Sequence, residues 1–590
     1  MSVENYLEPQ KQVKSLWHSL VEGKLNRRHL FKGVAAAGVA ATLPLQLRNA
    51  AAARLEPQAV ISQANTATES TPFFKPIQPS TADKLLVPEG FKAEVLAPWG
   101  AEIGGGAKVG FNHDFTAFFP IDMLAKGYDI NAPHRGFMTQ TMSSTEGILS
   151  INHEYINPLF VSNYDGKSEK KTADQLKAEQ EAVGLTLVHI KRDAAGKWAI
   201  DDSDTKINRR LSALTPMVLT GPAAKIDGGP NVIGTLGNCS GGVTPWGTVL
   251  SCEENFQDYP AAAPVGYGWD EKTYSKRHYG YVVEVDPFDN KSTPRKQTAL
   301  GRFRHENVAI RVGKDGTVVA YMGDDKADSC VFKFVADQKL APAKERAKNL
   351  KILESGKLYV ADFNNAKWIL LDYDKQTTLK EAKDANGKLL FTSQVDVLAD
   401  GRAAALAAKA TPVDRPEDIE IHPLDGSVYM SLTNNTGHGN FHGQIVRLQE
   451  DNDNPAAETF SWSIFAVGGP QSGFSSPDNL VFDGKGNLWM VTDVSSTRLN
   501  AGIYQFLGNN GMFYFHTTGP DAGVAYQFAS GPVECEMTGP SWTPDGSTLF
   551  LSVQHPGEES ASLTELSSHW PLGGKELPRP ALVAITGPWA

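Results

Sequence analysis

Short stretches of alternating hydrophobic and polar residues recur along most of the chain. One pattern consists of a turn glycine, an alternating apolar segment and a polar end, and it occurs six times. The copies are EGILSINHE (146–154), WGTVLSCEEN (246–255), DGTVVAYMGDD (315–325), DGSVYMSLTNN (425–435), KGNLWMVTD (485–493) and DGSTLFLSVQH (545–555). A hydrophobic period near two behind a turn residue predicts a β-strand in each case.

A second alternating pattern follows each copy of the first. Its members are LTLVHIKRD (185–193), YGYVVEVDP (279–287), DSCVFKFVAD (328–337), HGQIVRLQED (442–451), NAGIYQFLG (500–508) and RPALVAITG (579–587). Two strand patterns in six-fold alternation predict an all-β fold, a six-bladed β-propeller. We expect inserted loops and short helices at 162–182, 336–353 and 379–410, and FKAEVLAP (91–98) or a neighbouring early strand completing the last blade. A β-sandwich or a pair of barrels would also have short strands, but neither predicts this alternation.

The N-terminal region is typical of an export signal. An arginine pair in NRRHLFK (26–32) precedes an apolar run at 33–47 and then three alanines at 51–53. This order predicts a twin-arginine signal peptide over 1–53, read by the twin-arginine export machinery of a bacterium. A Ser/Thr/Pro/Ala-rich extended leader at 54–90 and a propeller domain at 91–590 would follow. The apolar run is too short for a good membrane span, so we expect a periplasmic or secreted protein without a stable membrane anchor. The alternative is an amphipathic helix that contains two arginines by chance.

Composition narrows the classes of partner. With 54 glycines, 35 prolines and 9% aromatic residues, many turns and short strands are favoured over long helices. The net charge of −11 argues against nucleic acid as a partner, because phosphate backbones attract basic surfaces. An acidic excess also suits cations bound by carboxylates. The four cysteines in 590 residues form no disulfide framework, although one or two bridges or buried inert thiols are both compatible with the sequence.

Polar residues at both ends of the repeated strands should converge at one end of a propeller channel. The entry segments are 238–240, 305–307, 415–418, 477–479 and 535–537, and the strand ends are 152–154, 253–255, 324–325, 434–435, 493 and 555. Packed acids repel one another and raise their pKa values unless a cation compensates. Oxygen ligands suit calcium, whereas a thiolate beside carboxylates suits iron or zinc. Any single acid here could instead be a solvated turn residue or a backbone cap.

Four of these segments carry ligand-type residues at matching positions. They are Cys239, Glu306, Glu417 and Asp478, and their equivalence favours metal ligands over isolated turn residues. Arg415 lies two residues before Glu417 among these anions. It can pair with a carboxylate or bind an anionic substrate through two hydrogen bonds, and phosphate is the natural match beside metals.

These segments also carry a resemblance to a known family. The leader, NCSGGVTPWGTVLSCEEN (238–255), GRFRHEN (301–307), RPEDIE (415–420) and SPDNLVFD (476–483) together resemble the PhoX alkaline phosphatases over most of the chain. The resemblance implies a monomeric, exported phosphomonoesterase that releases inorganic phosphate at a bridged cluster of Fe³⁺ and Ca²⁺.

The resemblance also implies roles for individual residues. Cys239 would bind iron with some of Glu254, Glu306 and Glu417, while the others and Asp478 would bind calcium. Arg415 and Asn479 would contact the phosphate of the substrate and carry the catalytic role. Asn152, Glu154 and Asp325 are further candidate metal ligands, and Asn112 and Asp114 fit the calcium side more loosely.

The chemistry so implied is metal-assisted hydrolysis, for which no serine nucleophile is needed. The sequence has no G-x-S-x-G motif and no phosphate-cradling glycine loop. Two alternatives stay open at this stage. A calcium-dependent propeller lactonase or esterase would need neither Cys239 nor Arg415 at the mouth. A non-catalytic binding propeller would present aromatic residues there and no metal.

Overall fold

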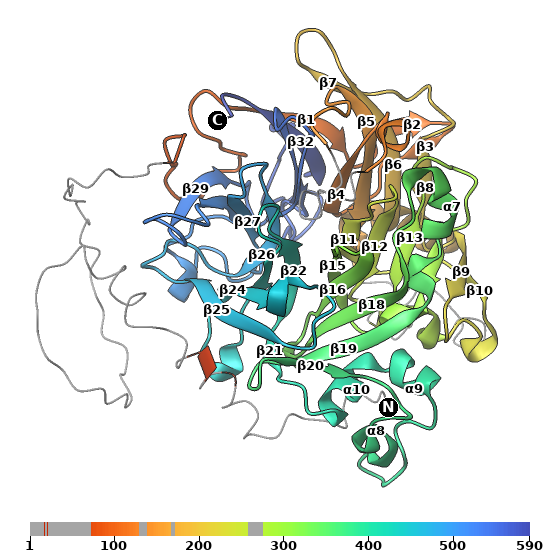
Figure 1. Cartoon of the computed structure of the whole chain (residues 1–590). Helices are drawn as coiled ribbons and strands as arrows, with labels where there is room; N and C mark the ends of the chain where they lie inside the picture. Colours follow the sequence, from red (N-terminus) through yellow and green to blue (C-terminus); the bar gives the residue numbers. More distant parts are fainter. Residues whose placement is uncertain are drawn as a thin grey trace, which may run out of the picture.

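The computed structural model shows strands arranged as six radial sheets around a central channel (Figure 1). It describes residues 17, 20–21, 72–128, 139–166, 171–257 and 275–589. The arginine pair, the apolar run and the alanine site of the predicted signal peptide lie outside the described residues. The prediction of a six-bladed β-propeller is confirmed.

Each blade contains at least four strands, and most of the chain follows them in order. The first blade comprises β4 (His113–Pro120), β5 (Glu146–His153), β6 (Gly184–Arg192) and β7 (Trp198–Ile200), with β8 (Arg209–Leu211) also paired to β6. The second comprises β11 (Asn238–Val243), β12 (Val249–Glu253), β13 (Val282–Val285), β14 (Arg295–Gln297), β9 (Pro216–Thr220) and β10 (Asn231–Ile233). The third comprises β15 (His305–Val312), β16 (Thr317–Asp324), β18 (Val331–Lys339), β19 (Gly356–Asp362) and β20 (Lys367–Leu370).

The remaining blades are four-stranded. The fourth comprises β22 (Pro416–Ile421), β23 (Val428–Leu432), β24 (Gln444–Glu450) and β25 (Phe460–Val467). The fifth comprises β26 (Pro477–Phe482), β27 (Leu488–Thr492), β28 (Gly511–Phe515) and β29 (Ala525–Ser530). The sixth comprises β30 (Glu536–Trp542), β31 (Thr548–Gln554), β32 (Ala581–Thr586) and β1 (Lys92–Pro98).

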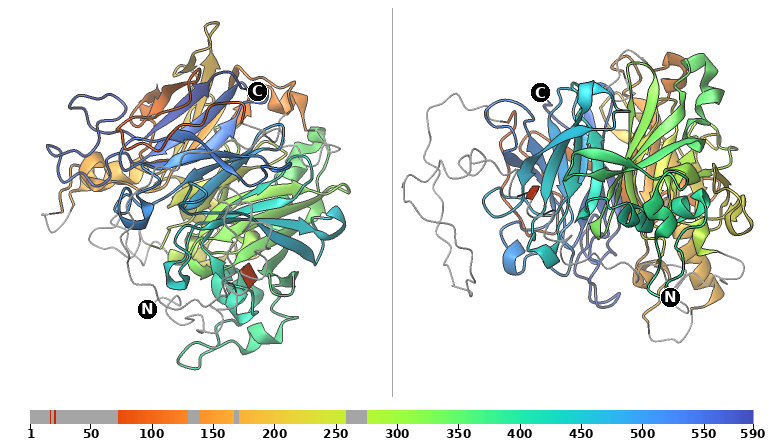
Figure 2. Two further views of the ribbon diagram at one scale, coloured as in Figure 1. Left: turned by 90° about the vertical axis from the view of Figure 1, so that its left-hand side faces the viewer. Right: turned by 60° about the horizontal axis from the view of Figure 1, so that its bottom comes forward.

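The ring closes in the sixth blade. Strand β1, which contains most of FKAEVLAP, pairs antiparallel with β32 of the last blade. The prediction that this early strand completes the last blade is confirmed. The first strands of the blades, β4, β11, β15, β22, β26 and β30, contact one another in that order, and β30 returns to β4. Figure 2 shows the segment around β1 (orange) and the segment around β32 (blue) side by side in two further views. One end of these six inner strands therefore surrounds a common space.

The strands are apolar on both faces because each blade is covered by its neighbours. In the hairpin of β15 and β16, the chain turns at Gly316, whose φ of +84° favours glycine. All eight residues of β15 and all seven of β31 are buried. Separate apolar clusters fill the spaces between adjacent blades. The period of two in the sequence therefore reflects alternation between two packed faces more than alternation between core and solvent.

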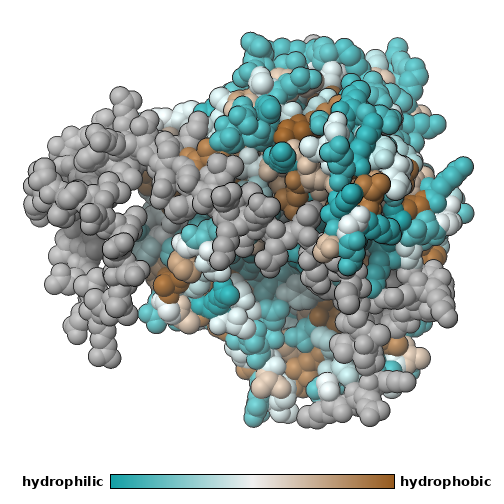
Figure 3. All heavy atoms as spheres, turned by 90° about the horizontal axis from the view of Figure 1, so that it is seen from below, coloured by the Kyte–Doolittle hydropathy of each residue, from teal (hydrophilic) through white to brown (hydrophobic). Residues whose placement is uncertain are grey.

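Helices occur in all three predicted insertions, and two more of the described helices occur in other loops, at 123–126 and 158–161. They are α3 (Met123–Lys126), α4 (Pro158–Val161), α5 (Ala173–Ala182), α7 (Arg346–Asn349), α8 (Thr377–Glu381), α9 (Gln394–Ala399) and α10 (Gly401–Ala407). None of the described helices is long and apolar enough to cross a membrane. Short strand pairs add β2 (Glu102–Gly104) with β3 (Ala107–Lys108), and β17 (Ala327–Ser329) with β21 (Val413–Asp414). The described surface in Figure 3 is largely hydrophilic, with separate hydrophobic patches.

One predicted strand is wrong. Residues 500–508 form a loop with a short 3₁₀ turn (Gly502–Tyr504), and the third strand of the fifth blade is β28 instead. Asn500, Gly502 and Gly508 all have positive φ, which extended backbone does not allow. Two apolar residues of this loop, Tyr504 and Leu507, are buried against the core instead of pairing in the sheet.

Segment 72–90 lies against the fifth and sixth blades without regular structure. Leu86 forms an isolated bridge with Ser530, and the Ile77 amide donates to the Gln527 carbonyl. Phe74 is buried among aromatic residues of the same region. All four cysteines of the chain are buried free thiols.

Candidate metal and phosphate site

The inner strands present their polar residues at β-bulges. Register shifts follow the first pair of β4, β11, β15, β22 and β26. A bulge bends the strand and re-aims a side chain that the regular alternation would point elsewhere. The residues that fall in these five bulges include Asp114, Cys239, Glu306, Glu417 and Asp478. The same local irregularity therefore places one ligand-type side chain in each of five blades.

The backbone before these residues also repeats. Two positions ahead of the ligand-type residue, φ is positive in five blades, at Asn112 (54°), Gly237 (60°), Arg415 (54°), Ser476 (48°) and Glu534 (60°). Left-handed backbone is uncommon outside glycine and clusters at functional sites. At Gly237, an added Cβ would lie 2.8 Å from the Asn255 amide nitrogen, so this position also requires glycine on steric grounds.

Three of these bulges, in β15, β22 and β26, carry a doublet whose second member binds the neighbouring blade. The side-chain amide of Asn307 donates to the Ile419 carbonyl at 2.8 Å and accepts from the Ile419 amide at 3.1 Å. The carboxylate of Asp418 accepts from the Leu480 amide at 2.7 Å, and Asn479 Oδ1 accepts from the Gly539 amide at 2.8 Å. These buried contacts connect the third blade to the fourth, the fourth to the fifth, and the fifth to the sixth. The first members of the doublets are left to face the channel.

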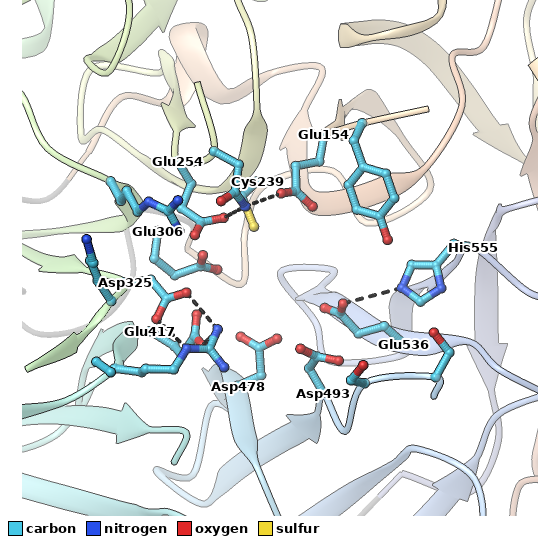
Figure 4. A pocket seen from close by; sticks show the side chains of 18 of the residues that line it. Glu154, Cys239, Glu254, Glu306, Asp325, Glu417, Asp478, Asp493, Glu536 and His555 are labelled. Atoms are coloured by element: carbon cyan, nitrogen blue, oxygen red, sulfur yellow. Dashed lines mark hydrogen bonds and ion pairs between the residues drawn. The ribbon is translucent and has the colours of Figure 1, made fainter. Parts of the chain in front are cut away.

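The first members surround a polar cavity of about 480 Å³, which we call the acidic cavity (Figure 4). Nine carboxylates line it against three cationic side chains. The lining residues are Glu154, Tyr155, Cys239, Glu254, Asn255, Arg304, Glu306, Asp325, Lys326, Ala327, Arg415, Glu417, Asp478, Asp493, Ser495, Ser496, Glu536, His555 and Glu558. In Figure 4 the acids point toward one another across the cavity. Such an excess of buried negative charge requires compensation.

The ligand atoms in and beneath this cavity form four overlapping groups of three. Within each group the ligand atoms all lie within 4.8 Å of one another. The groups are Asp114–Glu154–Cys239, Cys239–Glu254–Glu306, Glu306–Glu417–Asp478 and Asp478–Asp493–Glu536. Because neighbouring groups share Cys239, Glu306 or Asp478, they form one continuous row to which all six blades contribute.

The raised pKa values of this row show that its acids would be stabilised in their ionised form by a bound cation. Burial, and then repulsion from Asp114, raises the pKa of Glu154 to about 8. Burial, followed by the charges of neighbouring carboxylates, raises the pKa values of Glu254 and Glu306 well above the usual range. Burial likewise raises the pKa of the Cys239 thiol, which donates to Asp114 Oδ2 at 3.2 Å. A set of one thiol and eight carboxylates in this state fits multivalent cations, which would keep all of these groups ionised.

Arg415 is held at the edge of the row by two carboxylates. Its Nε and Nη2 donate to Asp325 Oδ1 and Oδ2 at 3.0 and 2.7 Å, and Nη2 is also 2.6 Å from Glu417 Oε1. Burial alone would lower the pKa of Arg415, but Asp325 and Glu417 raise it well above its ordinary value. In the part of the chain that the structure describes, these contacts leave the Nη1 hydrogens of Arg415 available to an anion in the cavity.

The rim opposite Arg415 contains a hydrogen-bonded group around Glu558. The Tyr155 hydroxyl donates to Glu558 Oε1 at 2.9 Å, and the Ser496 hydroxyl donates to Oε2. His555 Nδ1 is 3.5 Å from the same carboxylate, and its Nε2 is 3.7 Å from Glu536. His555 was expected in the ring as a strand end, whereas no sequence signal singled out Tyr155, Ser496 or Glu558.

The structure brings together six of the eight predicted metal ligands in this row. These are Glu154, Cys239, Glu254, Glu306, Glu417 and Asp478. Asp325 lies at the cavity wall but pairs with Arg415. Asn152 lies behind the cavity, where its amide donates to the Cys239 and Ser240 carbonyls at 2.7 and 2.9 Å. The prediction of Asn152 as a metal ligand is therefore not supported by this geometry, which gives it a role in positioning the Cys239 segment.

Asn479 also lies behind the acids. Its amide nitrogen is 3.1 Å from Asp478 Oδ1 and 3.4 Å from Glu306 Oε1, and its side chain does not line the cavity. Three further members of the row were not among the predicted ligands. Asp114 had only a loose assignment, and Asp493 and Glu536 were named only within the ring of strand ends and entry segments.

Comparison with known proteins bears on this site. The family model "Alkaline phosphatase PhoX" matches residues 73–557. The solved structure of Pseudomonas fluorescens PhoX in complex with vanadate, a transition state analogue, is 32% identical, with a TM-score of 0.75 over 87% of this chain and 98% of that chain. A gluconolactonase from Xanthomonas campestris is 11% identical, with a TM-score of 0.27 over 68% of this chain and 82% of that chain. This second likeness is too low to carry an argument. No curated protein matches the chain.

Proposed function

The chain belongs to the PhoX family of alkaline phosphatases, which are phosphoric monoester hydrolases, and from that premise we propose that it hydrolyses phosphate monoesters at an iron–calcium cluster in the acidic cavity. The observation that carries the metal part of this proposal is the continuous row of nine ligand-type residues, of which seven are buried and two are half-buried. The vanadate bound to the similar Pseudomonas fluorescens protein supports a phosphoryl-transfer site for this chain.

The chemistry of the donors suggests how the cations divide along the row. The only thiol, that of Cys239, is shared by two of the groups at one end, where Glu254 and Glu306 complete a mixed sulfur and oxygen set suited to iron. The opposite end, Asp478–Asp493–Glu536, offers oxygen alone and suits calcium. When bound, such cations would supply Lewis acidity and positive charge against the oxygens of the phosphoryl group.

The protein's own contribution to the reaction is orientation and charge. Phosphoryl transfer spreads negative charge over the equatorial oxygens in the transition state. Arg415 faces the cavity with Nη1 uncommitted while Asp325 and Glu417 hold the other guanidinium nitrogens. We assign it the binding and stabilisation of those oxygens. Asn479 would act through Glu306 and Asp478, which it contacts, and not through the substrate.

Export through the twin-arginine pathway, and hence a periplasmic or secreted location, completes the proposal. It rests on the order of arginine pair, apolar run and alanine site in the sequence. This pathway carries folded proteins, which suits a site that six blades must assemble before it can bind cations.

Metal analysis combined with a phosphatase assay tests the proposal. Purified full-length protein should contain iron and calcium and hydrolyse p-nitrophenyl phosphate, and a calcium chelator should abolish hydrolysis until calcium is restored. Cys239→Ala should lose iron and activity. Cys252→Ala is the matched control, because this buried thiol belongs to a core cluster outside the cavity. Full activity of Cys239→Ala with calcium alone would refute the role of iron. Full activity after removal of all metal would refute the metal site.

A further inference from the structure

Two residues upstream of the predicted arginine pair, Trp17 and Val21, are buried on the propeller, and Leu20 beside them is half-buried. Trp17, Leu20 and Val21 are helical, and we call them together the Trp17 anchor. Trp17 is 1% exposed and Val21 9%, and Leu20 packs against the same apolar cluster. In Figure 1 the anchor is the short red segment near strand β25. Residues of the predicted signal peptide therefore pack against the folded propeller.

The anchor occupies a groove built by two different blades. Phe363 follows β19 of the third blade, and Trp462 lies in β25 of the fourth. The Trp17 ring stacks on Trp462 with centroids 5.3 Å apart at 21°, and it meets Phe363 edge-on at 5.3 Å and 67°. The indole N–H of Trp462 donates to the Phe363 carbonyl at 3.0 Å, which joins the two walls. We call this the Trp462 groove.

The contact has the form of a helix bound in an apolar groove. Positions i, i+3 and i+4 lie on one face of a helix, and this spacing of anchors is the usual mode of helix-in-groove recognition. Trp17 Nε1 finds no hydrogen-bond partner among the described residues, so the contact depends on ring packing. Both walls must be in place to form the groove, which therefore exists only once the third and fourth blades have folded against each other.

We propose that the Trp17 anchor is a docking element that binds the uncleaved signal peptide to the folded propeller in the Trp462 groove. The arginine pair begins six residues after Val21, so docking would keep the export motif beside a domain that has already folded. This part of the inference rests on the proposed export. Removal of the predicted signal peptide near residue 53 would also remove the anchor and leave the Trp462 groove uncovered in the mature enzyme.

Hydroxyl-radical footprinting of the full-length, uncleaved protein tests the docking, because side-chain oxidation reports solvent access directly. We expect Trp462 to be protected in the parent protein and its oxidation to rise severalfold in Trp17→Ala. A synthetic peptide of residues 10–25 should restore the protection when added to Trp17→Ala, whereas the same peptide with Trp17→Ala should not.

Two controls separate docking from other effects. Leu30→Ala, which alters the leader outside the anchor, should leave Trp462 oxidation unchanged. Trp489, which is 1% exposed and packs in another core cluster, should be equally protected in all variants. Equal oxidation of Trp462 in the parent and Trp17→Ala would overturn the proposal. Neither phosphatase activity nor export enters this measurement, so its failure is distinguishable from a failure of the proposed function.

Discussion

Replacing Asp325 with asparagine tests whether this residue positions Arg415 or binds metal. The two side chains form a bidentate pair through Nε and Nη2 of the guanidinium, and the Asp325 side chain is only 5% exposed. Asparagine has nearly the same shape as aspartate but no charge. Its side-chain NH₂ group would face one of the two N–H donors of Arg415, where aspartate has an accepting oxygen. One of the two charge-assisted hydrogen bonds is therefore lost, while the contact between Arg415 and Glu417 remains.

The loss can be sized from this geometry. A hydrogen bond to a charged group contributes about 1.5–3 kcal/mol. If this free energy no longer holds Arg415 in place for the transition state, kcat/KM falls about 10- to 150-fold. Because the pair holds Arg415 and lies outside the four ligand groups, iron and calcium contents should not change. Arg415→Ala should be at least as impaired as Asp325→Asn.

Steady-state hydrolysis of p-nitrophenyl phosphate and elemental analysis of the same samples would measure these effects. A double-mutant cycle supplies the control, since Asp325→Asn should have little further effect in the Arg415→Ala background. Loss of calcium or iron from Asp325→Asn would show that Asp325 is a metal ligand. Fully additive effects of the two substitutions would refute the positioning role.

Three other predictions concern stability. Removal of metal should lower the unfolding temperature more at pH 9 than at pH 5. The pKa values of Asp114 (about 6) and Glu154 (about 8) are raised in the folded state. The metal-free fold is therefore most stable below the pKa values that these groups have in the unfolded chain, and it loses stability as pH rises through 6 and 8. A pH-independent effect in calorimetry would contradict this. Burial lowers the pKa of His305 from 6.5 to about 4. With metals in excess, about 3 kcal/mol of the free energy of unfolding should therefore be lost as pH falls from 6.5 to 4. In urea unfolding, His305→Gln should reduce this dependence of stability on pH. Asn479→Ala should cost about 1–3 kcal/mol by leaving the buried Gly539 amide unpaired, and an unchanged urea midpoint would exclude that contact as a source of stability.

The architecture was predictable because strand patterning repeats with the blades. Turn glycines and alternating apolar residues identify strands from local sequence, and six-fold alternation then limits the fold to few choices. Residues 500–508 show the limit of this reasoning. Their alternation matches a strand, but positive φ at Asn500 and Gly502 directs the chain into a loop. Periodicity reports which side chains are buried without stating which backbone conformation buries them.

The site was predictable as a set of segments but less so as individual residues. Glu253 and Glu254 are adjacent and chemically alike, yet Glu253 accepts from buried Lys296 at 2.7 Å while Glu254 lines the cavity. Asp324 and Asp325 divide in a similar way, since Asp324 pairs with Arg402. Which member of a doublet faces the channel depends on the register of the strand and on its neighbours in space. Neither is visible in a single sequence without the fold.

The pairing of β1 with β32 has a consequence for the order of events during synthesis. β32 (Ala581–Thr586) is synthesised long after β1 (Lys92–Pro98), so the sixth blade cannot be completed before residue 586 has been added. The row of ligands needs that blade, because Glu536 belongs to it. A site built from all six blades therefore forms only after synthesis has passed β32, and a chain that ends before residue 581 would lack the strand that joins β31 to β1.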